Sequence, residues 1–95
     1  MEVRYYLDAD TGLPHIAGHG VSEEEVEDVL SRPAEDRPGS GDSRVLIGRT
    51  RAGRRLKVIC VPDEEGEGVF VITAFELTGK PLAAFRRRMR RRGQS

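Results

Sequence analysis

Apolar residues occur in short runs with the two-residue periodicity of strands, and turn-forming residues separate the runs. Gly53 suits the left-handed position of a hairpin turn between the second and third runs. The last run is apolar on both faces, as a central strand would be. The pattern therefore predicts four strands, over residues 2–7, 44–50, 55–61 and 69–75.

The clearest helical pattern covers residues 21–30. Ser22 and Glu25 have the spacing of a capping box, in which each side chain accepts a hydrogen bond from the backbone N–H of the other residue. Val26 begins the apolar stripe of this helix, and Pro33 stops it. We therefore expect an amphipathic helix with an acidic first turn.

Two further helical segments are predicted, one before the helix of residues 21–30 and one after the last strand. Pro14 suits the first turn of a short segment that Gly20 would end. Thr78 opens a last helix, whose narrow apolar seam consists of Leu82, Phe85 and Met89.

These elements predict one α+β domain over residues 1–95, with an antiparallel sheet of three to four strands packed with helices on one face. Residues 34–43 are rich in Pro, Gly, Asp and Ser and predict an exposed loop. Residues 86–95 predict a basic C-terminal tail. The predicted core consists of Val26, Leu30, Leu56, Val58, Ile72 and Phe85.

Charged residues are sorted by position along the chain. Residues 1–42 contain three basic and eleven acidic side chains, whereas residues 44–95 contain thirteen basic and five acidic ones. The net charge of zero is therefore the sum of two halves with charges of −8 and +8. A small protein polarised in this way suggests an acidic partner for its basic half, most simply nucleic acid.

Composition also excludes several classes of protein. No apolar run is long enough to cross a bilayer, and the first twenty residues lack the apolar block of a signal peptide. Cys60 is the single cysteine, so no internal disulfide can form, and its apolar neighbours favour a place in the core over a reactive thiol. We therefore expect a cytoplasmic protein without a membrane partner and without a cofactor.

Two groups of side chains near the hairpin could carry chemistry. His15 and His19 have a metal-binding spacing, but a third ligand is missing, so we expect no metal and prefer His19 as a proton carrier. Arg49, Arg55 and Lys57 are predicted to share one face of the hairpin, where they could hold a phosphate. The alternative is a solvated outer face with acidic neighbours.

Glu76 and the C-terminal arginines form a third group. Glu76 lies next to the last strand, as either a general base or the partner of an arginine in an ion pair, and ion pairs are the more common. The arginine run could bind RNA, DNA or an acidic protein segment. Its candidate RNA contacts are Arg86, Arg87 and Arg90.

Several short motifs resemble the BrnT-type toxins and a related domain family of unknown function. The resemblance covers roughly residues 14–89. It rests on residues 19–26 (HGVSEEEV), 29–30 (VL), Pro33, 47–50 (IGRT), 53–54 (GR), 71–74 (VITA) and Thr78.

This resemblance implies a fold of the RelE/ParE toxin superfamily and a metal-independent endoribonuclease that is encoded with an antitoxin. In that chemistry the RNA 2′-hydroxyl attacks the adjacent phosphate, and the protein supplies a base, an acid and cations. By position, His19 matches the family histidine, and Arg49 and Arg54 match the basic hairpin.

The chain departs from the toxins at three positions. The toxins carry an arginine directly after the Ser/Thr-Ala pair of the strand that is predicted here over residues 69–75, and a glutamate and a tyrosine early in the last helix. Here these positions are Phe75, Pro81 and Phe85, which neither transfer a proton nor hold a phosphate. The sequence alone therefore leaves open whether the protein is an enzyme.

The preferred hypothesis is a BrnT-like toxin whose partners are RNA and a cognate antitoxin, with a homodimer as a further candidate. Its predicted catalytic residues are Glu76, His19 and Arg54. Its predicted RNA-binding residues are Arg49, Arg54, Arg55, Lys57, Arg86, Arg87 and Arg90. The alternative is a non-catalytic RNA- or protein-binding domain on the same fold.

Overall fold

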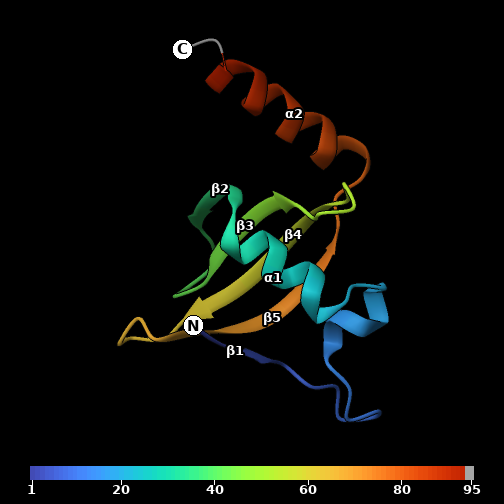
Figure 1. Ribbon diagram of the computed structural model, residues 1–95, viewed down its shortest axis with the longest axis vertical. Coiled ribbons are helices and arrows are strands. Elements are labelled where there is room, and N and C mark those ends of the chain that lie inside the picture. The colour runs from blue at the N-terminus through green and yellow to red at the C-terminus, as the bar shows by residue number, and fades with distance from the viewer. Residues whose placement is uncertain (94–95) are drawn as a thin grey trace.

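Five strands form a single mixed sheet in the order β1-β5-β4-β3-β2 (Figure 1). The computed structural model describes residues 1–93. The strands are β1 (Glu2–Tyr5), β2 (Pro33–Pro38), β3 (Arg44–Arg49), β4 (Arg55–Pro62) and β5 (Gly68–Glu76). The helical elements are the 3-10 helix η1 (His15–His19), α1 (Glu23–Ser31) and α2 (Gly79–Gly93). The α+β class is confirmed, whereas the predicted number and direction of strands were wrong.

The sheet differs from the prediction at both edges. The antiparallel succession of β3, β4 and β5 is confirmed, but β1 pairs with β5 in parallel, with Glu2 opposite Gly68. β2 occupies part of the predicted loop at residues 34–43 and pairs antiparallel with β3. The sequence pattern did not predict this strand, because its prolines are untypical of strands. An edge strand tolerates proline, because one side of its backbone needs no hydrogen-bond partner.

The helix α1 begins as its capping box predicts. The Ser22 hydroxyl accepts a hydrogen bond from the Glu25 N–H at 3.1 Å, and the Glu25 carboxylate accepts one from the Ser22 N–H at 3.0 Å. Val26 and Val29 are fully buried under this helix. Gly48 of β3 permits the close approach, because a Cβ there would lie 3.1 Å from the Val29 side chain. The cap and the apolar stripe thus place α1 against the sheet.

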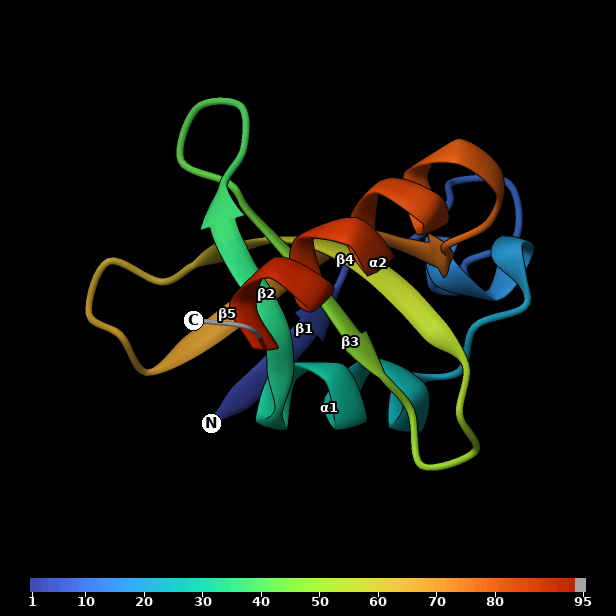
Figure 2. The ribbon, with the colours of Figure 1, turned by 90° about the horizontal axis from the view of Figure 1, so that it is seen from above.

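The two long helices lie on opposite faces of the sheet, which corrects the prediction of helices on one face. The main core lies on the α1 face and consists of Ile16, Val21, Val26, Val29, Leu46, Leu56, Val58, Cys60, Val69, Val71 and Ala74. On the other face Phe85 of α2 packs with Ile47 and Leu77, and Figure 2 looks onto α2 where it crosses the strands. Leu46 and Ile47 are neighbours on β3 and so point to opposite faces.

A bulge explains why one predicted core residue is exposed. The register between β4 and β5 shifts at Ile59/Cys60, so Thr73 lies opposite Ile59, Val71 lies opposite Cys60, and Ile72 stands between these pairs. Ile72 is 36% exposed. Val26, Leu56, Val58 and Phe85 are buried as predicted, and Leu30 is partly buried.

The sheet separates the acidic helix α1 from the basic helix α2. The predicted C-terminal tail at residues 86–95 belongs to α2 as far as Gly93, and residues 94 and 95 lie outside the described part of the chain. Arg88 anchors α2 to β2 through two hydrogen bonds, of 2.7 and 2.8 Å, to the carboxylate of Glu35. The charge sorting along the sequence therefore places an acidic helix and a basic helix on opposite faces of the sheet.

Candidate functional site

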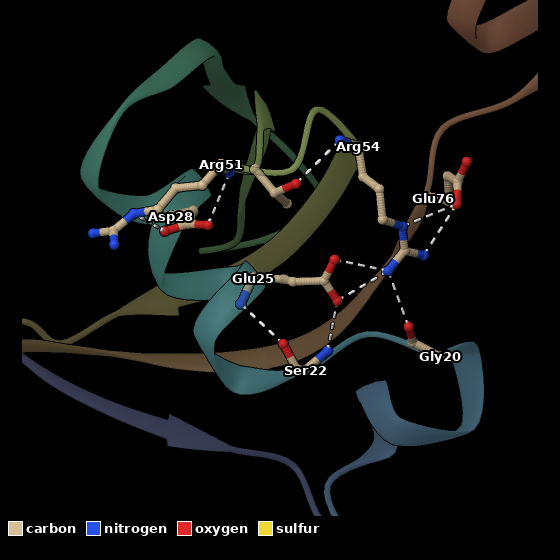
Figure 3. A network of polar contacts seen from close by, with 8 residues as sticks. Gly20, Ser22, Glu25, Asp28, Arg51, Arg54 and Glu76 are labelled. Atoms are coloured by element: carbon tan, nitrogen blue, oxygen red, sulfur yellow. Dashed lines mark hydrogen bonds and ion pairs between the residues drawn. The ribbon is translucent and has the colours of Figure 1, made fainter.

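Arg54 lies at the centre of a polar network that joins the hairpin to α1 and β5 (Figure 3). Its guanidinium donates to both carboxylate oxygens of Glu25, at 2.9 and 2.8 Å, and to Glu76 at 3.1 Å. A further hydrogen bond of 3.1 Å reaches the carbonyl of Gly20. The backbone N–H of Ser22 and, to a smaller extent, Arg54 lower the pKa of Glu25, which stays ionised in the network.

This network gives two of the predicted catalytic residues an ion-pair geometry. Arg54 and Glu76 bind each other, which is the alternative that the sequence left open for Glu76. A guanidinium that already contacts two carboxylates and a carbonyl has few donors left for an RNA phosphate. The arrangement suits a clamp that fixes the turn after η1, because Gly20 directly follows His19.

The other predicted RNA-binding cations have no such partners. Among residues 1–93, no ion pair is formed by Arg49, Arg55, Lys57, Arg86, Arg87 or Arg90. We call these six residues the cationic surface. In contrast, Arg4, Arg44 and Arg51 pair with Asp63, Asp36 and Asp28.

The hairpin part of the cationic surface lies on the α2 face of the sheet. Arg49 lies opposite Arg55, and Lys57 lies opposite Ile47, which packs under α2. Arg49 and Arg55 also line a small hollow beside Phe85. The predicted grouping of the hairpin cations is therefore confirmed, and strand alternation explains it.

The side chains of Asp8, His15 and His19 form a chain of contacts near the C-terminal end of β5. Nδ1 of His15 is 2.9 Å from Oδ1 of Asp8, and Nε2 of His15 is 3.3 Å from Nε2 of His19. The two imidazole rings meet edge to face, with centroids 5.0 Å apart. Asp8 and His15 are about one third exposed, with values of 36% and 38%, so these contacts are reachable from solvent.

Phe75 connects this chain to the cationic surface. The ring of His19 approaches the ring of Phe75 at 6.0 Å between centroids, and Nζ of Lys57 lies 5.9 Å from the centre of the same ring. Lys57 and Phe75 are direct neighbours across β4 and β5. The candidate site thus brings an imidazole, an aromatic ring and cations together at one end of the α2 face.

The structure also bears on the cysteine, on metal ligands and on membrane spans. Cys60 is buried, and its burial raises the pKa of the thiol, which disfavours the reactive thiolate. Within residues 1–93, no three histidine, cysteine, aspartate or glutamate side chains gather as a metal would require. The described helices are too short or too polar to span a bilayer.

Sequence reasoning missed Asp8 and the contact role of Phe75. Asp8 lies in a loop that folds back, with the Gly12 N–H donating to the Asp8 carbonyl. No spacing rule connects Asp8 to His15, because an irregular loop separates them. Phe75 was recognised as a departure from the toxins, and its position opposite Lys57 followed only from the strand register.

Comparison with known proteins identifies the domain without an activity. Residues 15–76 match the model of a domain of unknown function, DUF4258. This match begins at His15 and ends at Glu76, so it includes both imidazoles, the hairpin and the Arg54 network. Neither the curated proteins nor the solved structures yield a match.

Proposed function

The chain belongs to the DUF4258 family, and we propose that it is a BrnT-like toxin of a type II toxin–antitoxin system, a metal-independent endoribonuclease that acts in the cytoplasm. The observation that carries the proposal combines the cationic surface, whose six residues form no ion pair within residues 1–93, with the exposed imidazole of His19 beside Phe75 and Lys57. The reaction class comes by analogy from the resemblance of residues 14–89 to the BrnT-type toxins.

In the proposed reaction the RNA 2′-oxygen attacks the adjacent phosphorus. His19 accepts the hydroxyl proton, since an imidazole can change its charge near neutral pH. Lys57, Arg55 and Arg49 hold the phosphate as negative charge builds on its oxygens. The α2 arginines bind flanking phosphates, which extends the contact along a single strand. Arg54 and Glu76 act indirectly, by holding the Gly20 carbonyl next to His19.

The alternative, a binding domain without catalysis, has one observation of its own. A hollow with a volume of about 590 Å³ lies on the α2 face beside the loop after β2, and its apolar lining consists of Val45, Ile59, Val61 and Ile72. A protein partner would cover such apolar surface, whereas RNA offers little to match it. An acidic partner, such as the cognate antitoxin, would also complement the cationic surface.

The first test is RNA cleavage by the purified protein, with growth of an expressing culture as a second readout. Wild-type protein should cleave a single-stranded oligonucleotide to products with a 2′,3′-cyclic phosphate, and its expression should arrest growth. Lys57→Gln should lower kcat/KM, since it removes a phosphate contact. Arg51→Gln, on the opposite side and already paired with Asp28, is the charge-matched control.

The outcomes separate the two functions. Cleavage by the wild type that survives Arg51→Gln and falls with Lys57→Gln supports the ribonuclease. RNA binding without cleavage at any concentration supports the binding domain and removes the enzyme. Normal growth together with intact RNA overturns the toxin.

A further inference from the structure

We propose that Asp8, His15 and His19 form a proton relay whose reactive atom is Nδ1 of His19. This inference rests on the proposed ribonuclease function, and it assigns the general base together with two residues that position it. The supporting geometry is the pair of contacts of 2.9 and 3.3 Å that link the three side chains in series.

The contacts assign the protons on both rings. Asp8 is a carboxylate and can only accept, so Nδ1 of His15 carries a proton and donates it. Nε2 of His15 then has a lone pair and accepts from Nε2–H of His19. Nδ1 of His19 is left with a lone pair, and it has no hydrogen-bond partner within residues 1–93. This atom is therefore free to accept a proton from a substrate.

The relay also moves charge towards Asp8. When Nδ1 of His19 accepts the 2′-hydroxyl proton, His19 becomes a cation and passes its Nε2 proton to His15. The positive charge then lies on His15, beside the Asp8 carboxylate, instead of on an exposed ring. The Asp8 carboxylate therefore stabilises the charge that the proton transfer leaves on His15.

The chemical step balances without a metal or a cofactor. A bond forms between the 2′-oxygen and phosphorus, and the bond from phosphorus to the 5′-oxygen breaks. The products are a 2′,3′-cyclic phosphate and a 5′-hydroxyl. Water protonates the leaving 5′-oxygen, and the hydroxide takes the proton that His19 releases when the relay resets.

Other groups around the relay set its environment. The ring of Tyr6 meets His15 edge to face at 6.1 Å between centroids, and Phe75 lies between His19 and the Lys57 ammonium. Behind the turn, Arg54 pairs with both Glu25 and Glu76. Among the described residues, Asp8 is therefore the carboxylate that contacts the imidazoles.

Nitrogen NMR of the protein tests the relay directly, because it reports which ring nitrogen of each histidine carries the proton. His15 should be protonated at Nδ1 and His19 at Nε2, and Asp8→Asn should remove this preference at His15. Asp10→Asn is the control, because it removes a carboxylate of the same loop that contacts neither imidazole. The opposite tautomers, or an unchanged His15 tautomer in Asp8→Asn, overturn the relay.

Kinetics supply the second readout on single-stranded RNA. His19→Ala should lower kcat about 10²–10⁴-fold, with KM nearly unchanged, since a general base contributes in that range. Asp8→Asn should lower kcat with KM nearly unchanged, and Asp10→Asn should change neither. The expected tautomers in a protein that does not cleave RNA retain the relay and reject the ribonuclease, so the two failures are distinguishable.

Discussion

Single residues decide how the two halves of the charge distribution are held together. Glu35 is an acidic side chain that is only 3% exposed, and Arg88 of α2 contacts both of its carboxylate oxygens. Hydrogen bonds from Arg88 lower the pKa of Glu35 despite the burial of the carboxylate. A residue from the supposed loop thus supplies the anchor of the last helix.

The lowered pKa of Glu35 predicts a specific loss of stability in acid. Because the folded pKa lies below the ordinary value of 4.5, the ion pair contributes fully above that pH. The contribution is lost as the pH falls through the folded pKa. Urea unfolding at a series of pH values should therefore show a flatter acidic limb for Glu35→Gln than for the wild type. Glu65→Gln, in an exposed loop, should leave the limb unchanged, and equal limbs for all three proteins would contradict the assignment.

The Arg54 clamp predicts a stability effect that a phosphate-binding role would not produce. Arg54→Met removes the guanidinium donor from Glu25 and from the Gly20 carbonyl, which should cost about 1–3 kcal/mol in the free energy of unfolding. Arg51→Met removes a side chain that is 94% exposed and should cost less than about 0.5 kcal/mol. Urea denaturation measures both. Similar values for the two variants would show that Arg54 is not a clamp.

At the scale of elements, local sequence signals were reliable and long-range pairings were not. The capping box, the end of η1 at Gly20 and the three hairpin-linked strands all depend on residues close in the chain, and all are confirmed. The strand at β2 and the parallel pairing of β1 depend on distant partners. A local pattern carries no information on such partners, so the sheet edges could not be predicted.

Two isoleucines on the α2 side of the sheet, Ile47 and Ile72, give a prediction about packing at the scale of elements. Ile47 packs under α2 and is 2% exposed, whereas Ile72 lies at the bulge and is 36% exposed. Ile47→Ala should destabilise the protein by about 2–4 kcal/mol, since it leaves a cavity. Ile72→Ala should cost about 1 kcal/mol or less, because much of its surface already meets water. Urea denaturation compares the pair, and a larger effect for Ile72 would reject the described packing.

At the scale of the whole molecule, the sequence predicts that basic side chains gather in one part of the protein, but it does not predict which arginines form ion pairs. The count of charges predicted a basic half, and the hairpin alternation predicted a shared face. Tertiary contacts decide which arginines form ion pairs. Arg54 contacts Glu25 in this way, and the approach of Asp8 to His15 adds a residue that no pattern indicated.

Salt dependence of RNA binding tests this division of the arginines. For single-stranded RNA each phosphate contact contributes about 0.7 to the slope of log affinity against log salt. Replacing Arg86, Arg87 and Arg90 by Gln should therefore reduce the slope by about 2. Replacing Arg4, Arg44 and Arg51, which form ion pairs, changes the charge equally and should leave the slope nearly unchanged. Equal reductions in both triple variants would contradict a localised binding surface.

The parallel pairing of β1 with β5 links the fold to the order in which the chain is made. β1 leaves the ribosome long before its partner β5, which begins at Gly68. The same late strand carries Phe75, the aromatic neighbour of His19. A nascent chain therefore has its histidines before it has the strand that lies beside them, and it completes that corner only after β5 is made.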